Sequence, residues 1–398
     1  MINFLVIKSI RACNLACSYC YYINKETRNY GETISLAILE RLYEKYAEYL
    51  DADITVDFGW HGGEPLLLGR KRLQEFLDLQ HNYFPNRGIR NRIQSNRPLI
   101  DQAWIEFFKK NDMSVGISLD GLKESHDRNR TTRSGAGTFV ATVRAIQSLQ
   151  RNGVDVGVLA VVDGESNGAD TIQFFKRIGI RSLDLLLPIT NHAIQRLKGV
   201  TTPFGIDPEK VGGFLFDAFN RWMDLDDDSY DVLFFEAILQ NAFGMKTKYP
   251  YIGPPPEAIF EYVLVETNGD ICLDEEYGQI DRYGLGREYS LGINVLDPDF
   301  SFFRVEAALE RVIEERGLTN LPQPCKSCGV KSMCRGSHPG TRFDDRNGSY
   351  DNASVYCGPM LQLCREALRR IHIAGMTSHL HDPELRALAE LPLPSKGE

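Results

Sequence analysis

Three cysteines near the start of the chain, Cys13, Cys17 and Cys20, are spaced as CxxxCxxC, and Tyr19 stands directly before the third. Three thiolates on one short loop can hold three irons of a four-iron cluster, whereas closed iron–sulfur sites and structural zinc sites normally use four ligands. The iron left without a protein ligand could bind a small molecule and pass an electron to it. The spacing therefore favours reductive cluster chemistry, with a zinc knuckle or three unrelated reduced thiols as the alternatives.

This loop resembles the signature of radical S-adenosylmethionine (SAM) enzymes, CxxxCx(aromatic)C directly after a first strand. Residues 4–8, Phe-Leu-Val-Ile-Lys, would form that strand. The resemblance implies that Cys13, Cys17 and Cys20 hold a SAM-binding 4Fe–4S cluster and that Tyr19 is the aromatic of the cofactor site.

Short apolar runs alternate with amphipathic stretches from about residue 4 to residue 190. We expect strands at 4–8, 54–60, 90–94, 114–118, 154–162 and 182–187, and helices at 35–50, 70–83, 100–111, 138–152 and 168–178. Alternation of this kind predicts parallel βαβ units. The predicted fold class is α/β, a partial (β/α)6 TIM-like barrel followed by a small cysteine-rich α+β domain. Its chemistry should lie at the carboxyl ends of the strands.

A Gly-Gly-Glu-Pro turn follows the strand expected at 54–60. Glycines let the backbone approach a ligand closely, and a carboxylate can accept a hydrogen bond from an ammonium group. By the resemblance, Gly62, Gly63 and Glu64 bind the amino group of SAM. Alone, such a segment is more often only a turn.

Further polar segments follow the next strands in the order that radical SAM enzymes have. Gln94-Ser-Asn96 resembles the family's QTN segment, Ser118-Leu-Asp120-Gly resembles its ribose- and carboxylate-contacting segment, and residues 126–139 match HDxxR…GxGTF. The resemblance assigns cofactor binding to Gln94, Asn96, Ser118, Asp120 and Arg130. Arg130 would pair with the SAM carboxylate, because a guanidinium pairs bidentately with that group. Turn chemistry or surface ion pairs are the alternatives for each segment.

A second cysteine set lies near the C-terminus, since six of the nine cysteines fall between residues 272 and 364. CxxC spacing with two further cysteines gives four thiolates, enough for a closed 4Fe–4S cluster or for a zinc ribbon. The set resembles the second auxiliary cluster of SPASM domains, which implies the ligands Cys325, Cys328, Cys334 and Cys357.

The chain departs from a full SPASM domain, which carries two auxiliary clusters. His338 stands where the other cluster would expect cysteine, and Cys272 is the single cysteine upstream of 325 in this region. We therefore predict one auxiliary 4Fe–4S cluster and do not expect a second one at Cys272 and His338. Cys364 is expected to be a packed thiol.

Residues 265–274 and the segment Asn347-Gly-Ser-Tyr-Asp-Asn-Ala-Ser-Val-Tyr-Cys357 resemble cyclophane-forming maturases of ribosomally synthesised (RiPP) precursor peptides. The resemblance implies that a 5′-deoxyadenosyl radical takes a β-hydrogen and that the β-carbon then joins an aromatic ring carbon. Asp274 would be the base and the auxiliary cluster the electron acceptor, although Asp274 could also be a surface carboxylate. One departure is Arg335-Gly-Ser337, where a run of glycines is expected.

Two other functions compete with crosslinking. An anaerobic sulfatase maturase, which oxidises a Cys or Ser side chain to formylglycine, shares the same motifs but usually carries both auxiliary clusters. A non-catalytic zinc or iron–sulfur binding module is the alternative from a different class. The expected partners are a precursor peptide and an external electron donor such as a flavodoxin or ferredoxin.

Bulk properties limit the remaining possibilities. A chain of 398 residues is long enough for two domains. The net charge of −9 disfavours nucleic acid, and no apolar run approaches the ~20 residues of a membrane span. The absence of a signal-like N-terminus and the clustered cysteines favour a cytoplasmic metalloprotein. The predicted domains are a radical SAM barrel at 1–190, a helical bridge at 191–260, a SPASM-like domain at 261–370 and a tail at 371–398.

Overall fold

The computed structural model describes residues 1–23, 29–51, 53–197, 207–245, 247, 249, 252, 261–285 and 289–391. The chain divides into two compact units. Unit 1 comprises Met1–Leu159 and Phe260–Val312, and unit 2 comprises Ala160–Ile259 and Ile313–Glu398.

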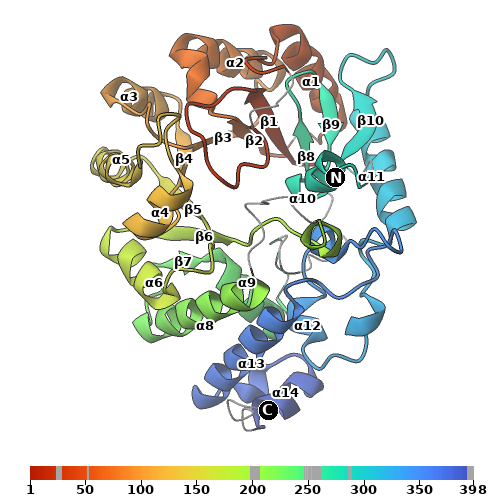
Figure 1. Ribbon diagram of the computed structural model, residues 1–398. Coiled ribbons are helices and arrows are strands. Elements are labelled where there is room, and N and C mark those ends of the chain that lie inside the picture. The colour runs from red at the N-terminus through yellow and green to blue at the C-terminus, as the bar shows by residue number, and fades with distance from the viewer. Residues whose placement is uncertain are drawn as a thin grey trace. The chain divides into compact units, whose positions relative to one another are not determined.

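Unit 1 is built on a sheet whose central strands are parallel (Figure 1). Neighbouring strands pair in the order β1 (Phe4–Ile10), β2 (Val56–Gly62), β3 (Ile89–Ser95), β4 (Met113–Ser118) and β5 (Val156–Val161). On the other side of β1 lie β8 (Tyr262–Val265) in parallel, then β9 (Asp270–Cys272) and β10 (Ser290–Asn294), which are antiparallel. Buried and half-buried side chains alternate along β2, β4 and β5, as expected for strands with period 2.

Helices connect these strands, and both α1 (Leu36–Tyr49) and α3 (Gln102–Lys110) begin at a side-chain cap. Ser35 accepts a hydrogen bond from Ile38 N at the start of α1, and Asp101 accepts one from Trp104 N at the start of α3. The other helices of unit 1 are η1 (Pro65–Leu68), α2 (Gly69–Tyr83), α4 (Lys123–Asn129), α5 (Phe139–Arg151), α10 (Glu275–Arg282) and most of α11 (Phe302–Arg316).

Aromatic side chains form much of the unit 1 core. The ring of Tyr46 on α1 lies 6.3 Å from that of Phe58 on β2 and 4.6 Å from that of Phe302 on α11. Contacts of this kind stabilise the packing beyond area burial alone. They join the first helix to a helix that follows it by more than 250 residues, so both segments of unit 1 share one core.

Unit 2 contains the parallel strands β6 (Ser182–Leu186) and β7 (Asp231–Val232). Its helices are α6 (Gly168–Arg177), α7 (His192–Gln195), α8 (Pro208–Leu225), α9 (Leu233–Ala242), η3 (Gln323–Cys325), α12 (Lys331–Cys334), η4 (Pro339–Arg342), α13 (Cys357–Ile373), η5 (Thr377–His379) and α14 (Pro383–Ala389). A Cβ on Gly168 would lie 2.0 Å from Phe214 O, so glycine is required where α6 packs against α8.

The predicted α/β class with parallel strands is confirmed, and each expected strand up to 187 is present with its ends shifted by at most a few residues. The described part of the segment predicted as a helical bridge, 191–260, contains the helices α7, α8 and α9. The tail contains α14, which the sequence did not predict. The domain boundaries stay predictions. Among the described helices, none has the length and apolar character needed to cross a membrane.

Candidate active site

The predicted cluster loop follows β1, and its three thiols are half-buried. Backbone bonds shape it, from Cys20 N to Cys17 O (3.2 Å) and from Ala16 N to Thr131 O (2.9 Å). Burial raises the pKa of Cys13 to about 12 and that of Cys17 to about 11, and the neighbouring cysteines add to both shifts. Thiols that raise one another's pKa need nearby positive charge to ionise. Three such sulfurs on one loop fit the iron of a 4Fe–4S cluster, which the chain would hold through Cys13, Cys17 and Cys20.

The Gly-Gly-Glu turn packs directly on this loop. Gly63 N donates to Ile10 O and Glu64 N to Ala12 O, both at 2.8 Å. A Cβ on Gly63 would lie 2.0 Å from Ala12 O, and Gly62 has a φ of +143°. The glycines are therefore required for close contact with the cluster loop itself, while their predicted contact with SAM stays a prediction.

Glu64 joins two of the predicted segments, its own glycine turn and the segment at 94–96. Its carboxylate is fully buried and accepts hydrogen bonds from Asn96 N (2.7 Å), Ser95 Oγ (3.0 Å) and Leu66 N (3.1 Å). Burial raises the pKa of Glu64 to about 7, and these hydrogen bonds oppose that shift. The carboxylate thus positions the residues that follow β3.

Asn96 in turn reaches the cluster loop. Its Nδ2 lies 3.2 Å from Cys13 Sγ and 2.9 Å from Asn14 Oδ1. Asn96 Oδ1 is buried and accepts no hydrogen bond within the described part of the chain. A buried acceptor without a donor, directly beside a cluster ligand, fits a site that receives a polar ligand such as SAM.

Asp120 and Arg130 form a buried ion pair after β4. Arg130 Nε donates to both oxygens of Asp120 at 3.0 Å, and the Tyr19 hydroxyl donates to the same carboxylate. The Arg130 guanidinium also lies 5.2 Å from the centre of the Tyr19 ring. The structure therefore brings together three predicted cofactor residues. Because Nε is engaged by Asp120, a SAM carboxylate would have to use the other N–H groups of Arg130.

Gln94 and Ser118 also meet. Gln94 Nε2 donates to Ser118 Oγ at 2.9 Å across β3 and β4. A Cβ at Gly116 would lie 2.1 Å from Gln94 Oε1, so a glycine on β4 makes room for this side chain. The carboxyl ends of three neighbouring strands thus carry the predicted polar residues, as parallel βαβ geometry requires.

Sequence reasoning missed a buried charged cluster made by Lys8, His61 and Glu275. Lys8 on β1 is 1% exposed, lies 3.3 Å from His61 Nδ1 and forms an ion pair with Glu275 in the first turn of α10. Its ammonium group also lies 4.8 Å from the centre of the Tyr22 ring. Burial raises the pKa of Glu275, and Lys8 opposes that shift. The available signal was one lysine at the end of the apolar run at residues 4–8.

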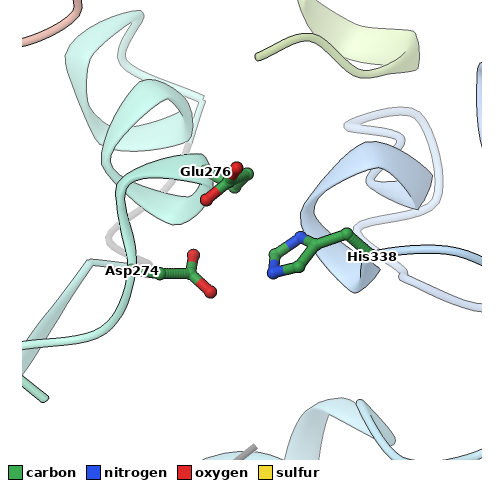
Figure 2. A group of neighbouring side chains, drawn as sticks. All are labelled: Asp274, Glu276 and His338. Carbon is green, nitrogen blue, oxygen red and sulfur yellow. The ribbon is translucent and has the colours of Figure 1, made fainter. Parts of the chain in front are cut away.

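Asp274, the predicted base, directly precedes α10, and Figure 2 shows its side chain together with that of Glu276. The Tyr262 hydroxyl lies 3.4 Å from Asp274 Oδ2. Figure 2 also shows His338, which precedes η4 and accepts a hydrogen bond from Gly340 N at 3.0 Å. Cys272 is buried on β9.

A cavity of about 400 Å³ lies beside the cluster loop in unit 1. Its lining includes Arg11, Tyr22, Glu266, Glu275 and Arg282, but not Asp274. Glu266 accepts hydrogen bonds from Arg11 (2.6 Å) and Tyr22 (2.8 Å). The cavity wall is therefore bonded to residues on both sides of the three cysteines.

Arg282 makes a second connection from this wall to the cluster loop. Its Nη1 donates to Cys20 O (3.1 Å) and to Tyr21 O (2.7 Å). Because Arg282 ends α10, this helix supports the last turn of the cysteine loop.

Three of the four predicted C-terminal cluster ligands lie at helix ends in unit 2. Cys325 ends η3, Cys334 ends α12 and Cys357 begins α13, while Cys328 N donates to Cys325 O at 3.1 Å. Burial raises the pKa of Cys334 to about 12, and Cys325 and Cys357 raise it further. Four neighbouring thiols fit a closed cluster.

Cys364 lies in the same unit, and it is buried, whereas the four predicted ligands are half-buried or exposed. It is fully buried on α13, and burial is the main cause that raises its pKa. This environment agrees with the expected packed thiol.

Comparison with known proteins gives the family and the relatives that this chain resembles. Residues 7–178 match the model of the Radical SAM superfamily. The chain is 29% identical over 364 residues to the serine-type anaerobic sulfatase-maturating enzyme of Bacteroides thetaiotaomicron, covering 85% of this chain and 83% of the relative. It is 26% identical over 382 residues to the cysteine-type enzyme of Clostridium perfringens strain 13, covering 93% and 97%.

Solved structures show the same fold. Native anSMEcpe with bound AdoMet superposes with a TM-score of 0.78 at 24% identity, covering 94% of this chain and 99% of that one. Streptococcus suis SuiB bound to S-adenosylmethionine gives a TM-score of 0.55 at 15% identity, covering 89% and 76%. The predictions of an enzyme, of SAM and of iron–sulfur chemistry are confirmed. Residues 7–178, which carry the three-cysteine loop and the parallel strands β1–β5, thus match the Radical SAM superfamily.

Proposed function

We propose that this enzyme matures a peptide or protein by removing two hydrogens from one of its side chains, beginning at a β-carbon. The observation that carries the proposal is the similarity to anaerobic sulfatase-maturating enzymes, which extends over 85–93% of the chain and so includes both units. When bound, SAM and its cluster supply the one-electron chemistry that takes hydrogen from an unactivated C–H bond. The chain supplies binding, orientation and a proton acceptor.

Oxidation of a serine or cysteine to formylglycine is the specific reaction that the relatives favour over the crosslinking that the sequence resemblance suggested. Crosslinking to a cyclophane is the second candidate, and one observation supports it. The segment from Asn347 to Cys357 carries the residues typical of cyclophane maturases and lies among the auxiliary cluster ligands. Both reactions begin at Cβ and end with loss of an electron and a proton.

The residues of unit 1 divide into binding and proton-accepting groups. Cys13, Cys17 and Cys20 would hold the SAM-binding cluster. The predicted contacts to SAM come from Tyr19, Gly62, Gly63, Glu64, Gln94, Asn96, Ser118, Asp120 and Arg130. A base must lie within hydrogen-bond reach of the proton that it accepts. Asp274 is our proposed base, and Glu275 is the alternative because it lines the cavity beside the cluster loop.

In unit 2, Cys325, Cys328, Cys334 and Cys357 would hold one auxiliary 4Fe–4S cluster, a group able to accept an electron. An external donor such as a flavodoxin or ferredoxin would reduce the SAM-binding cluster.

The test is anaerobic reconstitution followed by a dithionite assay for 5′-deoxyadenosine and mass spectrometry of candidate peptides. Two candidates are a serine-containing sulfatase peptide and the products of small open reading frames beside the gene. Oxidation of a serine to formylglycine and crosslinking of a β-carbon to an aromatic ring both lower the peptide mass by two hydrogens. Fragmentation of the peptide in the mass spectrometer must therefore show which residues have changed. A crosslink prevents separation of the joined residues, whereas formylglycine reacts with hydrazines. Cleavage of SAM without modification of any such peptide would contradict the proposal.

Matched variants distinguish Asp274 from Glu275 as the proton acceptor. If Asp274 is the base, Asp274→Asn should lower peptide oxidation at least about 100-fold while SAM cleavage persists, and Glu275→Gln should have a much smaller effect. The opposite order would assign the base to Glu275.

A further inference from the structure

We infer that a basic cavity in unit 2 binds carboxylate groups of the peptide substrate, an inference that depends on the proposed peptide maturation. The cavity has a volume of about 360 Å³. Its wall comes from segments before, between and after the cysteines of the predicted auxiliary cluster. It is lined by Leu318, Thr319, Asn320, Leu321, Lys331, Ser332, Arg335, Pro339, Arg342 and His381.

The lining is positively charged. Lys331, Arg335 and Arg342 carry permanent or near-permanent positive charge, and none of the described residues that line the cavity is acidic. Arg342 is held in place by hydrogen bonds to Leu318 O (3.1 Å) and Asn320 O (3.3 Å). A fixed guanidinium in a concave wall favours an anionic ligand.

Neighbouring carboxylates neutralise only part of the positive charge that lines the cavity. Glu384 accepts from Lys331 Nζ at 2.7 Å, and Asp382 accepts from Ser332 Oγ at 2.8 Å. The guanidinium of Arg335 makes no hydrogen bond or ion pair to any residue that the structure describes. Arg335 is therefore the group with hydrogen-bonding capacity left for a ligand.

The backbone around Arg335 gives an independent reason to assign a role to its side chain. Arg335, Gly336 and Ser337 have φ angles of +53°, +80° and +60°, so three successive residues are left-handed. Glycine adopts this conformation without steric cost, whereas arginine and serine do not. The backbone here would be relaxed with glycine at position 335, and the chain keeps a cation there instead. Strain of this kind, once observed, points to function.

The charge and the volume of the cavity indicate which class of ligand it binds. A guanidinium matches a carboxylate bidentately, and Lys331 and Arg342 add charge nearby. A cavity of this size encloses one or two acidic side chains of a peptide, whereas an electron-carrying protein needs a broad docking face. We therefore assign the cavity to an acidic segment of the substrate peptide.

The test is fluorescence anisotropy of labelled tetraglutamate added to the anaerobic holoenzyme, with labelled tetraglutamine as the control peptide. Tetraglutamate should bind, tetraglutamine should not, and salt should weaken the binding. Arg335→Gly should weaken it about tenfold without loss of iron or of thermal stability, because glycine suits the backbone at this position. Arg335→Lys should retain part of the affinity. Arg365→Ala, which removes an exposed arginine of α13, should change nothing.

Unchanged tetraglutamate binding by Arg335→Gly would overturn the inference. So would slower reduction by a flavodoxin with unchanged tetraglutamate binding, since that result would assign the cavity to an electron donor. Fluorescence anisotropy measures binding and requires no catalytic turnover. Failure of the carboxylate site can therefore be distinguished from failure of the proposed peptide maturation. Binding that depends on Arg335, in an enzyme that modifies no peptide, would support the carboxylate site and contradict peptide maturation.

Discussion

Asn96 donates a hydrogen bond to the thiol of Cys13 at 3.2 Å, across 83 residues of sequence. This bond links the end of β3 to the first cysteine of the cluster loop. A donor beside a cluster sulfur changes the electron affinity of the cluster, because hydrogen bonds to the sulfurs are among the factors that set its potential.

Replacing Asn96 with Ala should therefore slow SAM cleavage about tenfold, since a hydrogen bond to a charged group contributes roughly 1.5 kcal/mol. Iron content should be unchanged and the reduction potential of the SAM-binding cluster should fall. The measurements are 5′-deoxyadenosine formation and a spectroscopic redox titration. Asn220→Ala on α8 is the control, and an unaltered potential in the Asn96 variant would contradict the assignment.

Glu64 should make the stability of the metal-free chain depend on pH. Its pKa is raised from 4.5 to about 7 by burial, so the folded state holds the proton more tightly than the unfolded state. The stabilising contribution is complete below pH 4.5 and is lost as the pH rises to about 7, a total on the order of 3 kcal/mol. Chemical denaturation at several pH values should show this decline in the free energy of unfolding. Glu64→Gln should remove that component of the slope.

Cluster stoichiometry should separate the ligands from the packed thiol. Two 4Fe–4S clusters predict about eight irons per chain, and Cys334→Ala should leave about four while SAM cleavage persists. Cys364→Ala should keep all eight, because Cys364 is buried on α13 and is not a predicted ligand. About twelve irons in the unaltered protein would instead reveal a second auxiliary cluster.

Gly63→Ala should prevent assembly of the SAM-binding cluster. The added Cβ would lie 2.0 Å from Ala12 O, next to Cys13, so the cluster loop would have to move. Iron analysis should show loss of about four irons per chain. Gly213→Ala on α8 is the matched control, since a Cβ there meets open space and should stabilise the helix by about 0.5–1 kcal/mol.

The sequence was most informative where chemistry depends on local spacing. The CxxxCxxC loop, the glycine turn and the strand ends predicted a common site because the carboxyl ends of parallel strands lie together. Asp120, Arg130 and Tyr19 were each singled out, but the contact of Tyr19 with Asp120 spans 101 residues and leaves no local pattern.

The cluster of Lys8, His61 and Glu275 shows what spacing does not reveal. Glu275 pairs with a lysine 267 residues earlier in the chain, and only the placement of α10 beside β1 brings them together. The left-handed run at 335–337 was anticipated only as an expected run of glycines. The φ angles supply the reason, because each of the three positions favours a residue without a Cβ.

The hydrogen bonds from Arg282 to the carbonyls of Cys20 and Tyr21 join positions separated by more than 260 residues. A fragment that ends near residue 190 would retain every thiol of the N-terminal loop but would lose the side chain that fixes where this loop ends. A fragment truncated at that point should still take up iron but release it readily to chelators. The downstream half of the chain would then help to retain the cluster.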